Sequence, residues 1–150
     1  METARPLIQS ILVPVDGSST ALNAARFAIR VAQTYMAELC FIYVMDSRSV
    51  EKAARLSEDT EEGLGSNLKA QGQRYLNYAA KLAADAGQRA TTVLREGVPQ
   101  REITGEARRR RADLIVIGRV GQRGPRRILI GSVAERVIEY APCPVLVVQR

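Results

Sequence analysis

The sequence predicts an α/β protein: one domain with a doubly wound, five-stranded parallel sheet and helices on both faces, a Rossmann-like arrangement. Short apolar segments alternate with amphipathic segments of helical period along the whole chain. The apolar segments are continuous rather than alternating, as strands are when helices cover both faces of a sheet. The chain has 150 residues, of which 46% are hydrophobic, so we expect a single domain over residues 1–150.

The first segments predict a strand, a helix and a second strand. Residues 8–15 (IQSILVPV) predict a buried strand that ends at Pro14, and residues 16–20 (DGSST) then supply turn and N-cap chemistry. Residues 39–45 (LCFIYVM) predict the second strand. The helix between them has one apolar face, formed by Leu22, Ala25, Ile29, Ala32 and Met36.

The middle of the chain predicts a loop, a long helix and a third strand. Residues 46–65 are polar and lack a clear period, so we expect a loop with a short helical piece, which is the best candidate for mobility. Residues 66–86 follow a helical pattern that Gly87 would end, and residues 90–94 (ATTVL) form a β-branched strand. Two tyrosines of the helix are interpreted as core or surface residues rather than site residues, namely Tyr75 and Tyr78.

The last third of the chain completes the alternation. Pro99 suits the first turn of a short helix that would face Ile103 and Ala107 inward. A strand, a helix and a final strand follow, at residues 114–117, 131–140 and 145–148. Because crossovers between parallel strands are right-handed, this order gives a doubly wound sheet.

Composition excludes several classes of function. The net charge of +6 and the pI of about 9.8 favour anionic partners such as nucleotides. The sequence has no histidine, which excludes histidine triads, histidine metal ligands and histidine acid–base catalysis. Cys40 and Cys143 show no metal-binding spacing and are interpreted as reduced thiols of a cytoplasmic protein. We expect neither a secretory signal nor a membrane span.

Two loops are the candidate ligand site. One follows the first strand and contains Asp16, and the other runs from Gly118 to Ser132 after the fourth strand. In a sheet of order 3-2-1-4-5 these strands are neighbours, so their loops would face one crevice at the point where the strand order reverses. The sequence therefore predicts a ligand site at that edge of the sheet.

The chemistry of these loops favours an anion. Gly118 and Gly121 can take positive φ and let backbone N–H groups approach a phosphate. Gly131 and Ser132 stand at a predicted helix N-terminus, which attracts anions. Asp16 would accept from a ribose hydroxyl or a base amine, and positive charge would come from Arg119, Arg123, Arg126 and Arg127. Taken singly, each of these features is also explained as a turn or a helix cap. Two common nucleotide-binding motifs, the P-loop and G-x-G-x-x-G, are missing from the sequence.

The spacing of the glycines resembles a known nucleotide motif. Gly118 and Gly121 are separated by two residues, and nine residues separate Gly121 from Gly131-Ser132. This G-x2-G-x9-G-[ST] pattern is similar to that of the universal stress protein family. Four segments resemble the family in order and spacing: ILVPVDGS, GVPQREI, ADLIVIG and GSVAERVIEYAPCPVLVV.

The resemblance implies a sheet of order 3-2-1-4-5, ATP binding and a homodimer. It implies adenine and ribose contacts at Pro14, Asp16 and Val44, ribose contacts at Ile117 and Gly118, and phosphate contacts at Gly121, Gly131, Ser132 and Val133. It implies dimer contacts at the last strand, a bare apolar edge, through Val145, Leu146, Val147 and Val148. The chain departs from the family at Arg119 and Val120, where a small hydroxyl residue and a histidine are common, and some relatives prefer AMP or cyclic AMP.

We therefore expect an ATP-binding regulatory protein of the stress response that a protein partner reads. Little or no hydrolysis is expected, because no acidic residue lies between Gly118 and Ser132 and Mg²⁺ would receive no protein ligand there. A nucleotide-independent dimeric adaptor and an AMP or cyclic AMP binder are the alternatives. Nucleic-acid binding through Arg108–Arg111 is less favoured, because these arginines lack interleaved aromatic residues.

Overall fold

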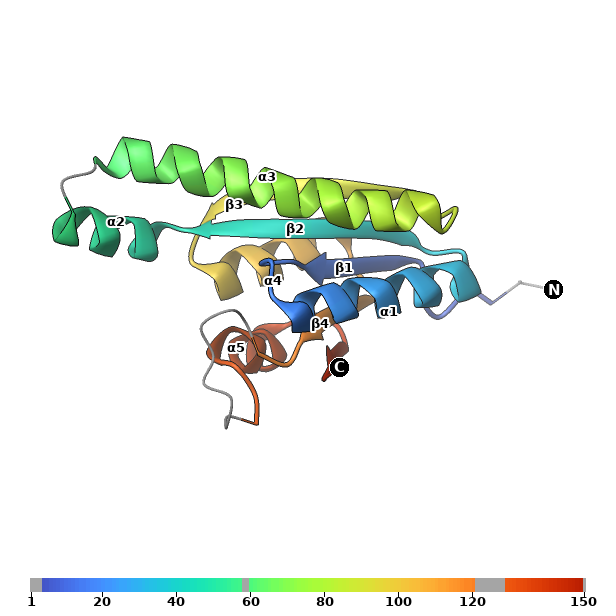
Figure 1. Cartoon of the computed structure of the whole chain (residues 1–150). Coiled ribbons are helices and arrows are strands. Elements are labelled where there is room, and N and C mark those ends of the chain that lie inside the picture. The colour runs from blue at the N-terminus through green and yellow to red at the C-terminus, as the bar shows by residue number, and fades with distance from the viewer. Residues whose placement is uncertain (1–3, 58–59, 121–128, 150) are drawn as a thin grey trace.

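A five-stranded parallel sheet forms the centre of the molecule (Figure 1). The computed structural model describes residues 4–57, 60–120 and 129–149. The strand order is β3-β2-β1-β4-β5, as predicted. The strands are β1 (Ser10–Pro14), β2 (Glu38–Asp46), β3 (Ala90–Gly97), β4 (Leu114–Gly118) and β5 (Val145–Val148).

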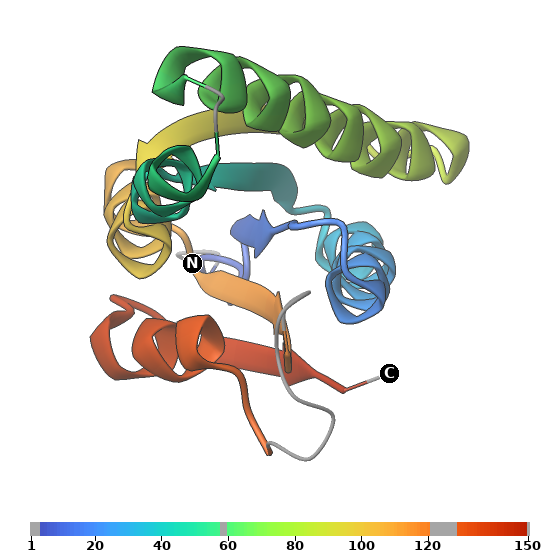
Figure 2. The ribbon, with the colours of Figure 1, turned by 60° about the vertical axis from the view of Figure 1, so that its left-hand side comes forward.

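Helices cover both faces of the sheet, which confirms the doubly wound α/β class (Figure 2). The helices are α1 (Ser19–Tyr35), α2 (Ser47–Leu56), α3 (Glu61–Asp85), α4 (Pro99–Arg110) and α5 (Ser132–Tyr140). Ile11 and Val13 of β1 pack with α1 and α3 in one core, whereas Leu12 packs with α4 and α5 in the other. This alternation follows from the two-residue period of a strand.

The first helix is held by its cap and by small side chains. The Ser18 hydroxyl accepts from the backbone N–H of Ala21 at 3.1 Å. Ala25, Ile29 and Ala32 are buried as predicted. Met36 is not: it is the left-handed C-cap residue, with φ of 54°, and is 92% exposed. The prediction placed Met36 inside because the helical period was extended one residue past the helix end.

The region between β2 and β3 is more helical than the sequence predicted. Residues 47–56 form α2, which is the expected short helical piece. Residues 61–85 form α3, which begins five residues before the predicted start at residue 66, so helices cover most of the expected loop. Asp46 caps α2 by accepting from the N–H of Arg48, and Thr60 caps α3 by accepting from the N–H of Gly63. Only Val50 of α2 is buried, so these turns lack the apolar period by which helices are identified.

Three smaller predictions have clear outcomes. Ile103 and Ala107 face inward from α4, as expected. Strand β3 extends past Leu94 to Gly97 because β2 continues to pair with it as far as Asp46. Cys40 and Cys143 are free thiols, and burial raises the pKa of each above its ordinary value.

No helix in the described ranges is long and apolar enough to cross a membrane.

Candidate functional site

A cleft of about 420 Å³ opens at the carboxyl ends of the strands. β1 pairs with both β2 and β4, so the loops that follow β1 and β4 lie side by side where the strand order reverses. This is the usual position for ligands in open parallel sheets, and the volume lies in the range of small-molecule sites. The topology thus brings the two predicted loops to one cleft.

Most of the predicted site residues line this cleft. They are Pro14, Asp16, Val44, Ile117, Gly118, Gly131, Ser132 and Val133. Four further predicted residues lie outside the described residues, namely Gly121, Arg123, Arg126 and Arg127. The remaining arginine, Arg119, is described but does not line the cleft.

Asp16 shapes the turn after β1. Its Oδ1 accepts from the backbone N–H of Ser18 at 2.9 Å, which makes a side-chain turn just before the N-cap of α1. Within the described part of the chain, no hydrogen bond to Oδ2 of Asp16 is present, and the residue is only partly buried. One carboxylate oxygen therefore holds the loop, and the other is available to a hydroxyl or amine of a ligand.

Tyr75 completes this side of the cleft, and sequence reasoning missed it. Gly17 has φ of +81°, and a Cβ added there would lie 2.3 Å from Cζ of Tyr75. The ring therefore packs directly on the turn, with the Tyr43 ring 6.0 Å from it between centroids. Tyr75 packs against the core, as predicted, and it also lines the cleft, whereas Tyr78 is half-exposed. The available signal was Gln71, a polar side chain on the same face of α3 as Leu68 and Tyr75.

Gly118 is required for packing rather than for an unusual backbone conformation. A Cβ at this position would lie 2.7 Å from the carbonyl carbon of Thr20 and 2.8 Å from the N atom of Ala21. Gly118 does not use the positive φ that a glycine permits: among the described glycines only Gly17, Gly87 and Gly97 have it. The N-terminus of α1 packs so closely on the end of β4 that no side chain fits between them.

The N-terminus of α5 supplies backbone donors to the cleft. Gly131 is its N-cap residue, and its own N–H donates to the carbonyl of Arg119 at 2.7 Å. No side chain caps this helix. Its first-turn N–H groups have no partner inside the helix, and the three residues that carry them line the cleft: Ser132, Val133 and Ala134. An anion would bind here through these donors and the helix dipole.

Arg119 braces the loop after β4. Its Nη1 donates to the carbonyl of Leu129 at 3.0 Å, and its backbone N–H donates to the carbonyl of Val148 at 2.9 Å. The Thr20 hydroxyl donates to the carbonyl of Val120, which joins the α1 side of the cleft to the same loop. The guanidinium of Arg119 is thus engaged at the base of the loop.

The walls between these two ends are apolar. They are formed by Val15, Ile42, Val44, Ile103 and Ile117. Two carboxylates line the cleft, and that of Asp46 also pairs with Arg48 at 3.2 Å. No cluster of metal-ligating side chains occurs in the ranges that the structure describes. The arrangement suits a flat, apolar ring system flanked by a hydroxyl group and an anion.

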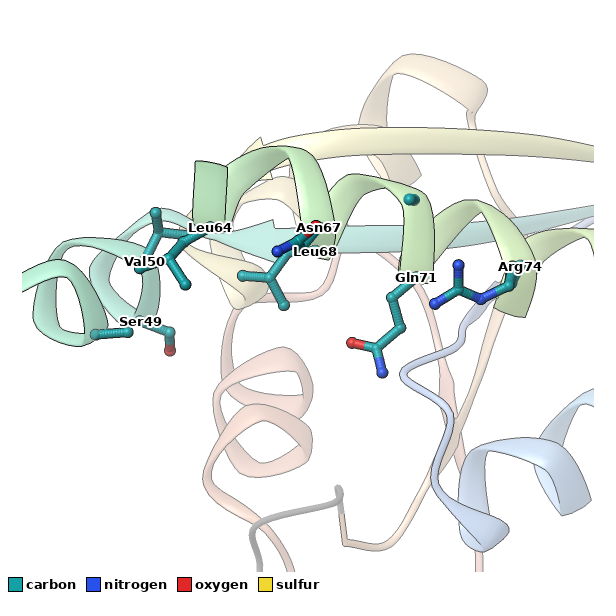
Figure 3. A pocket seen from close by; sticks show the side chains of 9 residues that line it. Ser49, Val50, Leu64, Asn67, Leu68, Gln71 and Arg74 are labelled. Atoms are coloured by element: carbon teal, nitrogen blue, oxygen red, sulfur yellow. The ribbon is translucent and has the colours of Figure 1, made fainter. Parts of the chain in front are cut away.

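A second groove continues the cleft between α2 and α3 (Figure 3). Its volume is also about 420 Å³, and it shares Ser49, Leu68 and Gln71 with the cleft. Figure 3 shows Gln71 and Arg74 on the same stretch of α3, beyond the apolar pair Val50 and Leu64. The early turns of α3, which the sequence did not predict, thus form part of the wall.

Comparison with known proteins agrees with the fold. Residues 8–149 match the model of the "Universal stress protein family". The universal stress protein MJ0531 of Methanocaldococcus jannaschii is 44% identical over 145 residues, which are 96% of this chain and 84% of the relative.

Solved structures are similar over almost the whole chain. Universal stress protein UspA from Lactobacillus plantarum superposes with a TM-score of 0.83 at 28% identity, covering 98% of this chain and 100% of that one. A universal stress protein solved in complex with cAMP superposes with a TM-score of 0.71 at 25% identity, covering 95% of this chain and 97% of that one.

Proposed function

The chain belongs to the universal stress protein family, and from this premise we propose that it is an ATP-binding regulatory protein of the stress response. One observation carries the proposal: a single apolar cleft has the Asp16 carboxylate on one rim and the uncapped N-terminus of α5 on the other. Adenosine supplies a flat ring and hydroxyl groups, and the phosphates supply the anion.

In this proposal each rim binds one part of the nucleotide. Pro14, Asp16 and Val44 contact the adenine and ribose, and Ile117 with Gly118 contacts the ribose. The N–H groups at the start of α5 hold the phosphates, as do Gly121, Arg123, Arg126 and Arg127. Arg119 braces the loop instead, because its guanidinium donates to the carbonyl of Leu129. The bound state of this loop is what a protein partner in the cytoplasm would read.

One feature supports binding without efficient turnover. In the described part of the cleft the carboxylates, Asp16 and Asp46, lie at the ends of β1 and β2, and none belongs to the residues at the start of α5 that line the cleft. Phosphoryl transfer requires a positioned water and usually Mg²⁺ held by carboxylates. We expect phosphate release over hours no faster than that of a Gly131→Glu variant, and clear release above this control would contradict the proposal.

The second candidate is a binder of AMP or cyclic AMP, favoured by the similarity to a relative solved with cAMP. A monophosphate needs only the start of α5, whereas a triphosphate also needs the arginine-rich loop. A nucleotide-independent adaptor is the third outcome, in which the loop only turns the chain.

The homodimer is proposed to form through β5. Val145, Leu146 and Val147 are only partly buried although apolar, and β5 pairs with one neighbour, β4, in the described sheet. A second copy would cover this edge. Sedimentation should show a species of twice 16.5 kDa, and a monomer at all concentrations would contradict this part of the proposal.

A thermal-shift panel on nucleotide-stripped protein tests the proposal. ATP with and without Mg²⁺, ADP, AMP, cyclic AMP and GTP are compared. A ligand at a hundred times its Kd should increase the free energy of unfolding by about 2.7 kcal/mol. This stabilisation corresponds to a rise of a few degrees in the Tm. Asp16→Ala and Gly131→Glu should abolish the ATP shift. Asp85→Ala and Ala84→Glu, at exposed positions at the far end of α3, are the matched controls and should retain it.

The outcomes separate the candidates. A shift by ATP alone supports the ATP proposal, and a larger shift by AMP or cyclic AMP supports the second candidate. If no nucleotide changes the Tm, nucleotide binding is wrong and the adaptor interpretation replaces it.

A further inference from the structure

The outer edge of β3 is open and polar. In the described sheet β3 pairs with β2 alone, over all eight of its residues. Thr91, Thr92, Arg95 and Glu96 are exposed along it. Open edges present unpaired N–H and C=O groups that can pair with a further strand. Strand β3 is twice as long as β5, the strand at the other edge.

A cluster of arginines flanks this edge on the α4 side. The carboxylate of Glu106, whose side chain is 4% exposed, accepts from Arg109 at 2.7 Å, Arg110 at 2.9 Å and Arg95 at 3.2 Å. Burial by itself raises the pKa of Glu106, but the hydrogen bonds from Arg109 and Arg110 lower it below its ordinary value. One buried carboxylate thus faces three guanidiniums, which leaves a positive surplus.

The guanidiniums are held in place and remain accessible. The side chains of Arg95 and Arg109 are 44% and 54% exposed. Arg110 also lies 3.4 Å from the hydroxyl of Thr91 on β3, which ties the cluster to the strand. Because Glu106 orients these side chains, an incoming anion meets them with little further loss of rotamer entropy.

The two features favour one kind of occupant. Only an extended backbone matches the row of donors and acceptors on a strand edge. Only a segment with acidic side chains matches the positive charge of the arginine cluster. A second copy of this chain would bring a second arginine cluster to the first. A nucleic acid would find no aromatic residue for stacking among the exposed residues of the β3 edge and the arginines beside it: Thr91, Thr92, Arg95, Glu96, Arg109 and Arg110.

We infer that the β3 edge, with its Glu106-centred arginine cluster, is a docking site for an extended acidic segment of a protein partner, which adds a strand beside β3. Eight residues of strand span about 26 Å, so the segment has roughly seven or eight residues. The inference is independent of the nucleotide cleft, which lies at the carboxyl ends of the strands.

Binding of a labelled peptide tests this inference on the intact chain. The probe is acetyl-TEVEVET, and its charge-reversed partner is acetyl-TKVKVKT. Fluorescence polarisation at about 50 mM salt should show saturable binding of the acidic peptide alone. Arg95→Gln/Arg109→Gln should weaken it about tenfold. Arg26→Gln/Arg30→Gln, which removes two exposed arginines from α1, is the matched control and should leave it unchanged.

Amide hydrogen exchange distinguishes strand addition from loose electrostatic attraction. Residues 91–96 should become protected when the acidic peptide binds, while the nucleotide-induced Tm shift remains as it was. Failure of the acidic peptide to bind the unaltered protein would overturn the inference. This outcome does not depend on whether the Arg95→Gln/Arg109→Gln variant folds. Equal binding of the lysine peptide, tighter binding of single-stranded DNA, or binding without protection of β3 would also overturn it.

Discussion

The two rims of the cleft are built by different means. On the β1 rim, side chains hold the backbone: Asp16 accepts from the Ser18 N–H, and the Tyr75 ring packs on Gly17. On the β4 rim, backbone meets backbone, because Gly118 lies against Thr20 and Ala21 with no room for a Cβ. Substitution of Gly118 should therefore act mainly on stability, whereas some substitutions on the β1 rim should act on ligand binding alone.

The largest effect is expected for Gly118→Ala. The added Cβ would overlap the backbone of α1, which cannot move without moving the helix, so stability should fall by about 1–3 kcal/mol. Urea unfolding measures this. The matched control is Gly65→Ala in α3, where an added Cβ has nothing within 4 Å and should stabilise by about 0.5–1 kcal/mol. Equal urea midpoints for Gly118→Ala and wild type would contradict the claim that close backbone packing holds the β4 rim.

Gly17→Ala should cost about 1–2 kcal/mol. Part of this cost is the positive φ of +81°, and part is the clash with the Tyr75 ring. Adding Tyr75→Ala should recover the steric part and not the conformational part, so the double variant should be more stable than the sum of the two single changes implies. Strict additivity of the unfolding free energies would show that the ring does not press on the turn.

Thr20→Val should cost about 1 kcal/mol by removing the hydrogen bond between the rims. The hydroxyl donates to the carbonyl of Val120, which then loses its partner from α1. Thr34→Val is the matched control, because its hydroxyl bonds only within α1, to the carbonyl of Arg30. Chemical denaturation should rank Thr20→Val clearly below Thr34→Val in stability; the reverse order would contradict a structural bridge.

The smallest effect on stability is expected for Asp16→Asn, below about 0.5 kcal/mol. The amide oxygen keeps the hydrogen bond to the Ser18 N–H while the charge is lost. If the carboxylate binds the nucleotide, titration calorimetry should still show weaker ATP binding. Unchanged affinity would assign Asp16 to the turn alone. The side chains of the β1 rim would then hold the loop without binding the ligand.

Much of the fold was predictable because it depends on local periods. The continuous apolar runs at residues 39–45 and 114–117 indicated buried strands, and the alanine-rich stripe of α1 indicated a helix packed on a sheet. The start of α3 was not predictable in this way. Its first turns, around Gly63 and Gly65, have no apolar period, and their helical state rests on the Thr60 cap and on packing of Leu64 and Leu68.

The candidate site shows the same division. Asp16, Gly131 and Ser132 could be named from the sequence because turn and cap chemistry is local. Tyr75 was missed although Gln71 on the same face of α3 gave a signal, because its contact with Gly17 joins residues far apart in the chain. The packing reason for a glycine at position 118 was likewise not predictable, since the approach of α1 to the end of β4 is not a local property.

The sequence by itself determined the alternation of strands and helices, the strong positive charge and the exclusion of histidine chemistry. These follow from composition and from the short-range periods that each element needs to bury one face. Only the tertiary structure decided which glycine is needed for packing, which tyrosine closes the cleft and which edge carries the arginines. Those features depend on distances between segments that are brought together only when the sheet forms.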